Sequence, residues 1–286
     1  MPAQPGPSVR RRQLGATLRS LRETAGITAE EAAVVLDCHA SKLSRLENGR
    51  SGVRPRDVRD LLSRYGVDDE GLRTALEALA RTSYQRGWWH QYSGTLDQEH
   101  TDFIGLEATA SSVRNFQPLL IPGLLQTEDY LTAIIESHHI QDTPEQVAAR
   151  VAVRTARQEV LTRAQNPLSL WVVVHEAAVR HVVGGREVMR AQIQHIREWA
   201  AVPNVTVQVL PFAAGAHAGM HGPFAIVSFP ALAALDVVYI ENLTSSLYVE
   251  EPEQVQTYTG GFDHLRAAAL APKESLAFLA HLGKDL

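Results

Sequence analysis

The stretch ITAEEAAVVLDCHASKLSRLENG, residues 27–49, contains two short helical patterns separated by a turn. Thr28 is a residue type that caps helix N-termini, and Glu31, three positions later, completes a capping box. The alanines that follow, together with Leu36, give this helix a buried side. The first pattern therefore predicts a helix that begins just after Thr28.

A turn and another helix follow. Asp37 and Cys38 interrupt the apolar spacing, which resumes from about His39 to Glu47. Leu43 and Leu46 face inward in this second pattern, and the Asn-Gly pair after it is a helix-ending signal. We expect two short helices joined by a tight turn.

Three further helices flank this pair. One is predicted from Gln13 to the glycine at position 26, one over residues 55–65 with a proline in its first turn, and one from about Asp68. Five short helices with a tight turn between the second and the third describe a helix-turn-helix domain, expected over residues 10–82. The prolines of residues 1–9 predict a disordered lead-in, and we expect no secretory signal there.

Residues 18–67 resemble the phage-repressor or XRE-type family of helix-turn-helix proteins, through the segment S-R-L-E-N-G at Ser44 to Gly49. The resemblance implies an all-α fold and sequence-specific binding to double-stranded DNA. Two positions depart from the family pattern. Asp37 stands where a turn glycine is usual, although aspartate tolerates the left-handed region better than most residues. Ala40 stands where many members carry a polar side chain that reads a base.

The second helix of the pair is the expected recognition helix. Such a helix fits the major groove of B-DNA, about 12 Å wide, and presents its N-terminal residues to base edges. Arg45 is the expected base reader, because one guanidinium can bond O6 and N7 of guanine together. Ala40 suits a thymine methyl, and Ser41 and Ser44 suit a base or a phosphate. The residues expected at phosphates are Arg22, Thr28, His39, Lys42, Asn48 and Arg50.

The alternative is a helical bundle whose outer face is only solvated. Under that interpretation Lys42 and Arg50 are ordinary surface charges. Glu47 is in either case expected to be structural, paired with an arginine of the same domain.

The formal net charge of −5 hides an uneven distribution. Residues 1–66 carry 12 basic and 7 acidic side chains, whereas the remainder carries 15 basic and 25 acidic ones. The N-terminal part is thus +5 and the rest −10. This asymmetry indicates that the N-terminal part meets a polyanion, with chance variation in surface charge as the alternative.

Cysteine and apolar content indicate the compartment. Cys38 is the single cysteine, so the chain can form no intramolecular disulfide, which is typical of a reducing cytoplasm. No apolar run approaches the ~20 residues that a membrane span requires. We expect a cytoplasmic protein, associated with the nucleoid when it binds DNA, and no membrane contact.

The remainder of the chain predicts a larger second domain. Residues 83–101 are interpreted as an aromatic linker around YQRGWWHQY, and residues 102–286 as an α+β domain with a mostly antiparallel or mixed sheet. Helices are predicted at about 102–115, 127–138, 144–164, 186–201, 251–270 and 272–283. Strands are predicted at 168–174, 204–210, 223–229, 236–241 and 246–249.

The motifs FQPLLIPGLLQTEDY, residues 116–130, and NVTVQVLPFAAGAHAGMHGPFAIVSFP, residues 204–230, resemble the large C-terminal domain of many actinobacterial XRE-type regulators. The resemblance extends from Gly87 to the end of the chain. It implies a regulator, often an antitoxin-like partner of a small protein encoded nearby, and it implies no settled biochemical role for the domain.

Catalytic and metal-binding patterns are lacking in the sequence. His175 and His181 are six residues apart, so they point about 120° apart on a helix, whereas a zinc-protease helix needs a separation of four. No nucleophile elbow and no phosphate-binding loop motif occurs. We therefore expect no enzyme, no catalytic residue, no metal and no cofactor.

Arg150, Arg154 and Arg157 lie at i, i+4 and i+7 and form one basic stripe on a predicted helix. A solvated or acid-paired face is favoured over a phosphate site.

Three functions remain open. The first is a dimeric transcriptional regulator whose C-terminal domain dimerises and senses a small partner protein or a small-molecule effector. The second is an antitoxin-like module that neutralises a small cognate protein and regulates its own operon. The third is an enzyme fused to a DNA-targeting domain, for which the sequence gives no positive sign.

Overall fold

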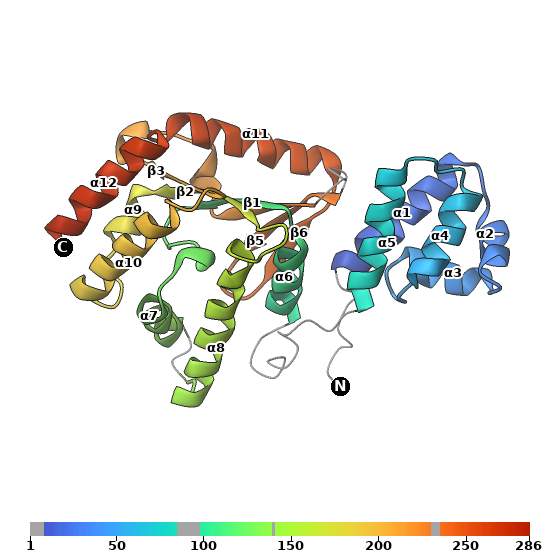
Figure 1. Cartoon of the computed structure of the whole chain (residues 1–286), viewed down its shortest axis with the longest axis horizontal. Coiled ribbons are helices and arrows are strands. Elements are labelled where there is room, and N and C mark those ends of the chain that lie inside the picture. Colours follow the sequence, from blue (N-terminus) through green and yellow to red (C-terminus); the bar gives the residue numbers. More distant parts are fainter. Residues whose placement is uncertain (1–8, 85–97, 139–140, 230–234) are drawn as a thin grey trace. The chain divides into compact units, whose positions relative to one another are not determined.

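The computed structural model describes residues 9–84, 98–138, 141–229 and 235–286. The chain divides into two compact units, one of residues 1–90 with 230–235 and one of residues 91–229 with 236–286. Figure 1 shows both units, and each is described by itself. Residues 1–8 of the predicted lead-in and residues 85–97 of the predicted aromatic linker lie outside the described residues.

The described part of the N-terminal unit contains five helices, as the sequence predicts. They are α1 (Val9–Thr24), α2 (Ala29–Val35), α3 (Ala40–Glu47), α4 (Pro55–Arg64) and α5 (Glu70–Tyr84). Their apolar faces share a core in which the largest fully buried side chains are Leu14, Leu18, Leu43, Leu61, Leu62 and Leu76. Helix α1 begins at Val9, four residues earlier than predicted. Val9 is only 1 % exposed, so the lead-in prediction is wrong at this residue.

The local signals at the turn act as the sequence predicts. Thr28 and Glu31 form the capping box of α2. Asp37 has a φ of 47°, so an aspartate adopts the left-handed turn that the family usually gives to glycine. Gly49 ends α3 with a φ of 70°, and a Cβ there would lie 2.8 Å from the backbone nitrogen of Arg12. Only glycine meets both requirements at this position.

The C-terminal unit is an α+β domain built on a six-stranded mixed sheet of order β3-β2-β1-β4-β5-β6. The strands are β1 (Ser112–Gln117), β2 (Ser169–His175), β3 (Val205–Leu210), β4 (Phe224–Ser228), β5 (Val237–Glu241) and β6 (Ser246–Val249). β1 pairs parallel with β2, and β2 with β3, whereas β1–β4, β4–β5 and β5–β6 pair antiparallel.

Helices lie on both sides of this sheet. The described ones are α6 (Gln98–Thr109), α7 (Glu128–His138), α8 (Pro144–Arg157), α9 (Glu176–Arg180), α10 (Arg186–Trp199), α11 (Pro252–Ala268) and α12 (Pro272–Asp285). Figure 1 shows the sheet almost edge-on, with α11 on one side and α6, α7 and α8 on the other. Phe116, Ile226 and Val238 face α11 and join Phe262 and Leu265 of that helix in one buried core.

Two predictions for this domain are wrong in part. The helix predicted over 102–115 ends at Thr109, and Ser112–Gln117 is instead a strand with partners on both sides. The helix predicted over 144–164 ends at Arg157 and continues as a 3₁₀ turn, Gln158–Leu161. The short helix α9 was not predicted. In β1, pairing with two neighbouring strands overrides a local pattern rich in polar residues.

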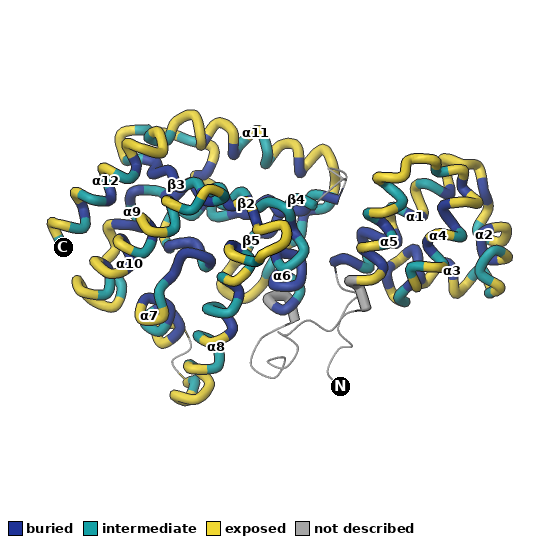
Figure 2. Tube along the Cα trace, in the orientation of Figure 1, coloured by how far each residue is buried: buried dark blue, intermediate teal, exposed yellow. Residues whose placement is uncertain are grey.

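Burial follows this layering. Figure 2 shows most of the sheet buried or intermediate, and exposed residues along the outer sides of α10, α11 and α12. Within the described ranges, no helix is long and apolar enough to cross a membrane.

Candidate nucleic-acid interface

Helix α3 is held against α1 by a close backbone approach. A Cβ on Gly15 of α1 would lie 2.5 Å from the carbonyl oxygens of Leu46 and Glu47, closer than real side chains come. Leu43 and Leu46 are buried on this side of α3. The glycine therefore lets the last turn of α3 rest directly on α1, which fixes the direction of its opposite face.

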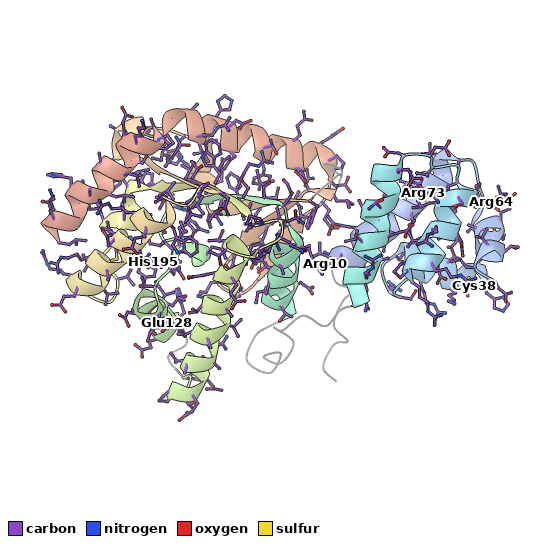
Figure 3. All side chains as sticks on the ribbon, viewed as in Figure 1. Arg10, Cys38, Arg64, Arg73, Glu128 and His195 are labelled. Atoms are coloured by element: carbon purple, nitrogen blue, oxygen red, sulfur yellow. The ribbon has the colours of Figure 1, made fainter. Side chains whose placement is uncertain are left out.

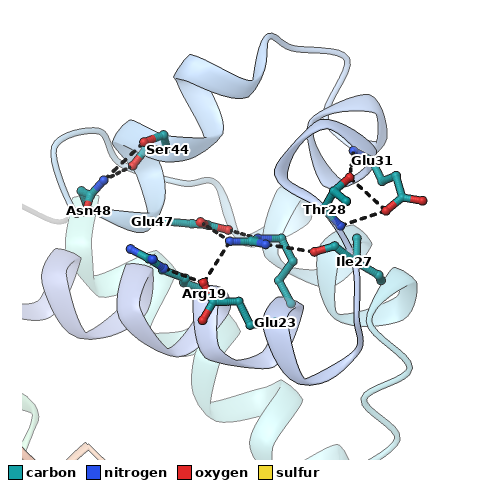
Figure 4. A network of polar contacts seen from close by, with 9 residues as sticks. Arg19, Glu23, Ile27, Thr28, Glu31, Ser44, Glu47 and Asn48 are labelled. Atoms are coloured by element: carbon teal, nitrogen blue, oxygen red, sulfur yellow. Dashed lines mark hydrogen bonds and ion pairs between the residues drawn. The ribbon is translucent and has the colours of Figure 1, made fainter.

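A buried ion pair secures the same junction (Figure 4). Arg22 Nε donates to Glu47 Oε1 at 2.7 Å, and Arg22 Nη2 donates to Glu47 Oε2 at 3.0 Å. Arg22 Nη1 also donates to the carbonyl of Ile27 at 2.9 Å. The hydrogen bond with Glu47 raises the pKa of the Arg22 guanidinium against the effect of burial. One side chain thus joins α1, the loop before α2, and α3.

The start of α2 is closed by its own capping box. Thr28 Oγ1 accepts from the backbone N–H of Glu31 at 3.2 Å, and Glu31 Oε2 accepts from the Thr28 N–H at 2.8 Å. The bonds that the Thr28 N–H and the Thr28 hydroxyl donate to Glu31 Oε2 lower the pKa of the Glu31 carboxyl. An ionised carboxylate consequently occupies the helix end that the sequence assigns to a phosphate.

The outward face of α3 carries most of the predicted DNA-contacting residues. At about 100° per residue, positions 40, 41, 44, 45 and 48 fall within an arc of about 140°. Ser41, Lys42, Ser44 and Arg45 are exposed, and Ala40 is half-buried. Glu47 is the acidic residue of α3, and it is turned inward and neutralised by Arg22. The exposed face of α3 is therefore purely cationic and polar.

Asn48 caps the C-terminal end of α3 (Figure 4). Its Nδ2 donates to the carbonyl oxygen of Ser44 at 2.8 Å and lies 3.4 Å from the Ser44 hydroxyl. The amide thus caps the last turn and orients the serine beside it.

Eight of the ten predicted site residues lie together on or beside α3. They are His39, Ala40, Ser41, Lys42, Ser44, Arg45, Asn48 and Arg50. His39 is the N-cap residue of α3, and its side chain makes no capping bond. Arg22 is only 8 % exposed and is fully engaged inside the domain, so its observed role is structural and it is not retained as a DNA contact. Thr28 is exposed but is not retained as a DNA contact either, because the Glu31 carboxylate bonded to it would repel a phosphate.

The structure also brings forward residues that the sequence did not single out. Arg54 and Arg56 are exposed at the start of α4, and Arg56 lies 3.8 Å from Asp60. The Arg-Pro-Arg sequence around Pro55 was the signal available for them. Cys38 is half-buried on the turn between α2 and α3 (Figure 3).

The arginine stripe of the C-terminal unit is mostly acid-paired, as favoured from the sequence. Arg150 Nε lies 2.7 Å from Asp142 Oδ2, and Arg157 Nε lies 2.9 Å from Glu107 Oε1. Arg154 forms no hydrogen bond or ion pair with any described residue. Among the residues that the structure describes, no three His, Cys, Asp or Glu side chains lie close enough together to hold a metal ion.

Comparison with known families agrees with this division of the chain. Residues 100–281, more than half of the chain, match the model of a family described as a domain of unknown function (DUF5753). Residues 13–76 match the model of a helix-turn-helix domain, and this range contains every predicted site residue. No curated protein and no solved structure matches the chain.

Proposed function

Because the chain belongs to the family of the domain of unknown function DUF5753 and carries a helix-turn-helix domain before it, we propose that it regulates transcription by binding specific sites on double-stranded DNA. The N-terminal unit is the DNA-binding part. The family description leaves the role of the C-terminal unit open.

The cationic outer face of α3 is the observation that carries this proposal. Its acidic residue, Glu47, is buried against Arg22, whereas Lys42 and Arg45 are exposed. An isolated cationic helix face of this size suits the major groove, which is about 12 Å wide and lined by phosphates. A solvated face of a structural bundle does not require its acids to be turned inward.

The eight retained residues divide by chemistry. Arg45 has the planar donor pair that reads guanine, and Ala40 offers a methyl group to thymine. Ser41 and Ser44 are short enough to reach a base edge or a phosphate. His39, Lys42, Asn48 and Arg50 lie towards the ends and sides of α3, where phosphate contacts fix the register of a recognition helix.

The test begins with a genome-wide map of bound sites, from which an operator fragment is chosen. Arg45→Ala is then compared with the unchanged chain in gel shifts at fixed salt. We expect specific binding to be lost while circular dichroism stays unchanged. The matched control is Arg81→Ala, which removes an exposed arginine from the last turn of α5. Unchanged affinity of Arg45→Ala for the operator would rule out α3 as the recognition helix.

We further propose that the regulator acts as a dimer through its C-terminal unit. One recognition helix contacts only a few base pairs, and dimers place two such helices about 34 Å apart on one face of DNA. The bound sites should then be inverted repeats with that spacing. Removal of residues 87–286 should weaken operator binding strongly, and a truncated monomer that binds as tightly as the full chain would refute dimerisation through this unit.

We also propose that the protein is cytoplasmic and that its C-terminal unit senses a signal. The −10 charge of the chain beyond residue 66 suits a small basic protein partner, as in an antitoxin-like module. Co-purification of the product of a small neighbouring gene supports that version, and its absence supports a small-molecule effector. An enzymatic role is not proposed.

A further inference from the structure

The C-terminal unit contains a cavity of about 750 Å³ on the side of the sheet opposite α11. Its floor is made of alternate residues of neighbouring strands. Val113 and Asn115 of β1 lie beside Leu170 of β2 and Ala225 of β4, and Ala225 pairs in turn with Tyr239 of β5. Side chains at these alternate strand positions point to the face of the sheet opposite Phe116, away from the core under α11.

Helices and loops close the cavity from the other sides. Phe103 and Glu107 of α6 lie in its wall, with Ile121 and Leu124 of the segment before α7 and Ile134 of α7. Helix α8 contributes its three arginines, and the turn after β5 lies at the rim. The volume falls in the range of about 300–1,000 Å³ that is typical of small-molecule sites. All these residues belong to the C-terminal unit.

The three arginines of α8 differ in their partners. Arg157 is bound by both carboxylate oxygens of Glu107, at 2.9 Å each, and Arg150 is bound by Asp142. Arg154 also lines the cavity, yet it has no hydrogen-bond or ion-pair partner among the described residues. Burial lowers the pKa of its guanidinium, and the nearby charge of Arg157 acts in the same direction. An arginine in this setting lacks the ion pair that partly buried cations normally form, although the Glu241 carboxylate acts on its pKa in the opposite direction.

Two amide oxygens in the cavity wall also lack partners. Gln126 is 5 % exposed, and its Nε2 donates to the carbonyl of Ile121 at 2.6 Å, which fixes the orientation of the amide. Its Oε1 is buried without a hydrogen bond in the described part of the chain, and so is Asn115 Oδ1. More than about 90 % of buried polar groups in folded proteins are paired. Neither oxygen has a donor within the described part of the chain, so a ligand with hydroxyl or N–H groups would satisfy them.

The charged side chains of the cavity wall indicate what charge a bound anion should carry. Of the acids in the wall, Glu107 is paired with Arg157, and Glu241 lies near enough to raise the pKa of Arg154 without forming an ion pair with it. One unpaired guanidinium beside a carboxylate suits a singly charged group and disfavours a doubly charged phosphate. The apolar walls formed by Phe103, Ile134 and Leu170 suit an apolar body.

We propose that this cavity binds a small apolar carboxylate, whose carboxylate group is held by Arg154 and whose hydroxyl or N–H groups donate to Gln126 and Asn115. This inference names the ligand class for the sensing role proposed above and rests on that role, but it does not depend on DNA binding. The carboxylate supplies the ion pair that Arg154 lacks among the described residues, and the donors satisfy the two amide oxygens.

Isothermal titration calorimetry on the full chain tests the inference with two matched pairs of probes. These are decanoate with decan-1-ol, and 4-phenylbutyrate with 4-phenylbutan-1-ol. We expect at least one acid to bind once per chain and its alcohol to bind much more weakly. Arg154→Gln should weaken the acid by roughly ten- to a hundredfold and leave the alcohol unchanged, because a charge-assisted bond is lost. Arg197→Gln, an exposed change on α10, should leave both unchanged.

A second variant keeps the test independent of Arg154. Gly123 lines the cavity, and a Cβ there would lie 3.9 Å from Arg157 with no closer contact, so Gly123→Ala should narrow the cavity without a clash. It should weaken acid and alcohol alike.

Failure of both acids to bind, equal binding of acid and alcohol, or stronger binding of inorganic phosphate would overturn the inference. Gel shifts of the ligand-free chain report on DNA binding separately, so either proposal can fail alone.

Discussion

Arg22 of α1 and Glu47 of α3 form a two-bond ion pair, at 2.7 and 3.0 Å, in which both residues are less than a tenth exposed. The residues are separated by 25 positions and join the first helix to the end of α3. The cationic character of the outer face of α3 depends on this pair, because it removes the helix's acidic side chain from the surface.

Glu47→Gln is expected to destabilise the N-terminal unit by up to about 3–5 kcal/mol, because it removes the buried counter-charge of Arg22 and leaves only the half-exposed Glu23 carboxylate, 3.6 Å away. Hydrogen exchange of the α1 and α3 amides in the full chain measures this effect. The matched control is Arg19→Gln on the same helix. Arg19 and Glu23 form an exposed pair, 54 % and 53 % accessible, whose loss should change the exchange rates little. Equal exchange rates in the two variants would contradict a structural role for the buried pair.

Gly15→Ala should also weaken the packing of α3 on α1, although alanine by itself favours a helix more than glycine does. Alanine favours a helix by about 1 kcal/mol over glycine, but the new Cβ would meet two backbone oxygens of α3 at 2.5 Å. Neither oxygen can move without moving α3, so the melting temperature and the operator affinity should both fall. Gly260→Ala in α11 is the control, since its Cβ would meet nothing within 4 Å. That variant should stabilise its domain slightly, and a similar gain for Gly15→Ala would refute the close approach.

The arginines of α8 allow a stability comparison within one helix. Arg157→Gln should destabilise the C-terminal unit by about 3–5 kcal/mol, because Glu107 is 2 % exposed and would lose its cation. Arg154→Gln should cost little or increase stability, because no described acid depends on it. Differential scanning calorimetry of both variants without ligand provides the measurement. A loss for Arg154→Gln as large as that for Arg157→Gln would indicate an unrecognised partner.

His195 of α10 should make the C-terminal unit sensitive to acid. Burial lowers the pKa of its imidazole below the ordinary value of 6.5, although Glu198 acts in the opposite direction. Its Nε2 accepts from the indole N–H of Trp199 at 3.0 Å, which the protonated ring cannot do.

Between the lowered pKa and 6.5 the unfolded chain therefore binds more protons, so the free energy of unfolding rises with pH in this window and levels off above it. His195→Gln keeps an acceptor for the indole but does not titrate, so it should reduce the dependence to the part contributed by His175, whose pKa burial also lowers. His281→Gln, which changes an 82 % exposed side chain, should leave the dependence unchanged. A dependence as steep in His195→Gln as in the unchanged chain would assign it to another group.

The helix-turn-helix could be predicted from the sequence because its signals are local. The Thr28 capping box, the Asp37 turn and the Asn-Gly ending act within a few residues, and the structure contains all three. The partner of Glu47 cannot be identified from the neighbouring sequence, because it lies on another helix. An arginine partner was expected, but Arg22 was assigned to phosphate, because spacing along one helix does not reveal what lies across the interface.

Strand β1 and the cavity show the same limit on a larger scale. Ser-Val-Arg-Asn-Phe-Gln lacks the apolar content of a central strand, and it becomes one through pairing with residues more than 50 positions away. The cavity wall draws on residues from Phe103 to Ser246, so no window of sequence contains it. The arginine stripe was visible, but only the folded structure separates unpaired Arg154 from its two acid-paired neighbours.

Salt dependence separates phosphate contacts from base reading on α3. The logarithm of the binding constant falls linearly with the logarithm of salt concentration, by about 0.9 per phosphate neutralised. Lys42→Ala should therefore reduce the slope by about one unit and weaken operator and random DNA alike. Arg45→Ala should reduce operator binding far more than binding to random DNA, because its contact is to a base. Fluorescence anisotropy of both fragments over a salt series gives the slopes, with Arg81→Ala as the charge-matched control. If Arg45→Ala weakened both fragments equally, Arg45 would be a phosphate contact, and the reading of guanine would have to come from another residue of the α3 face.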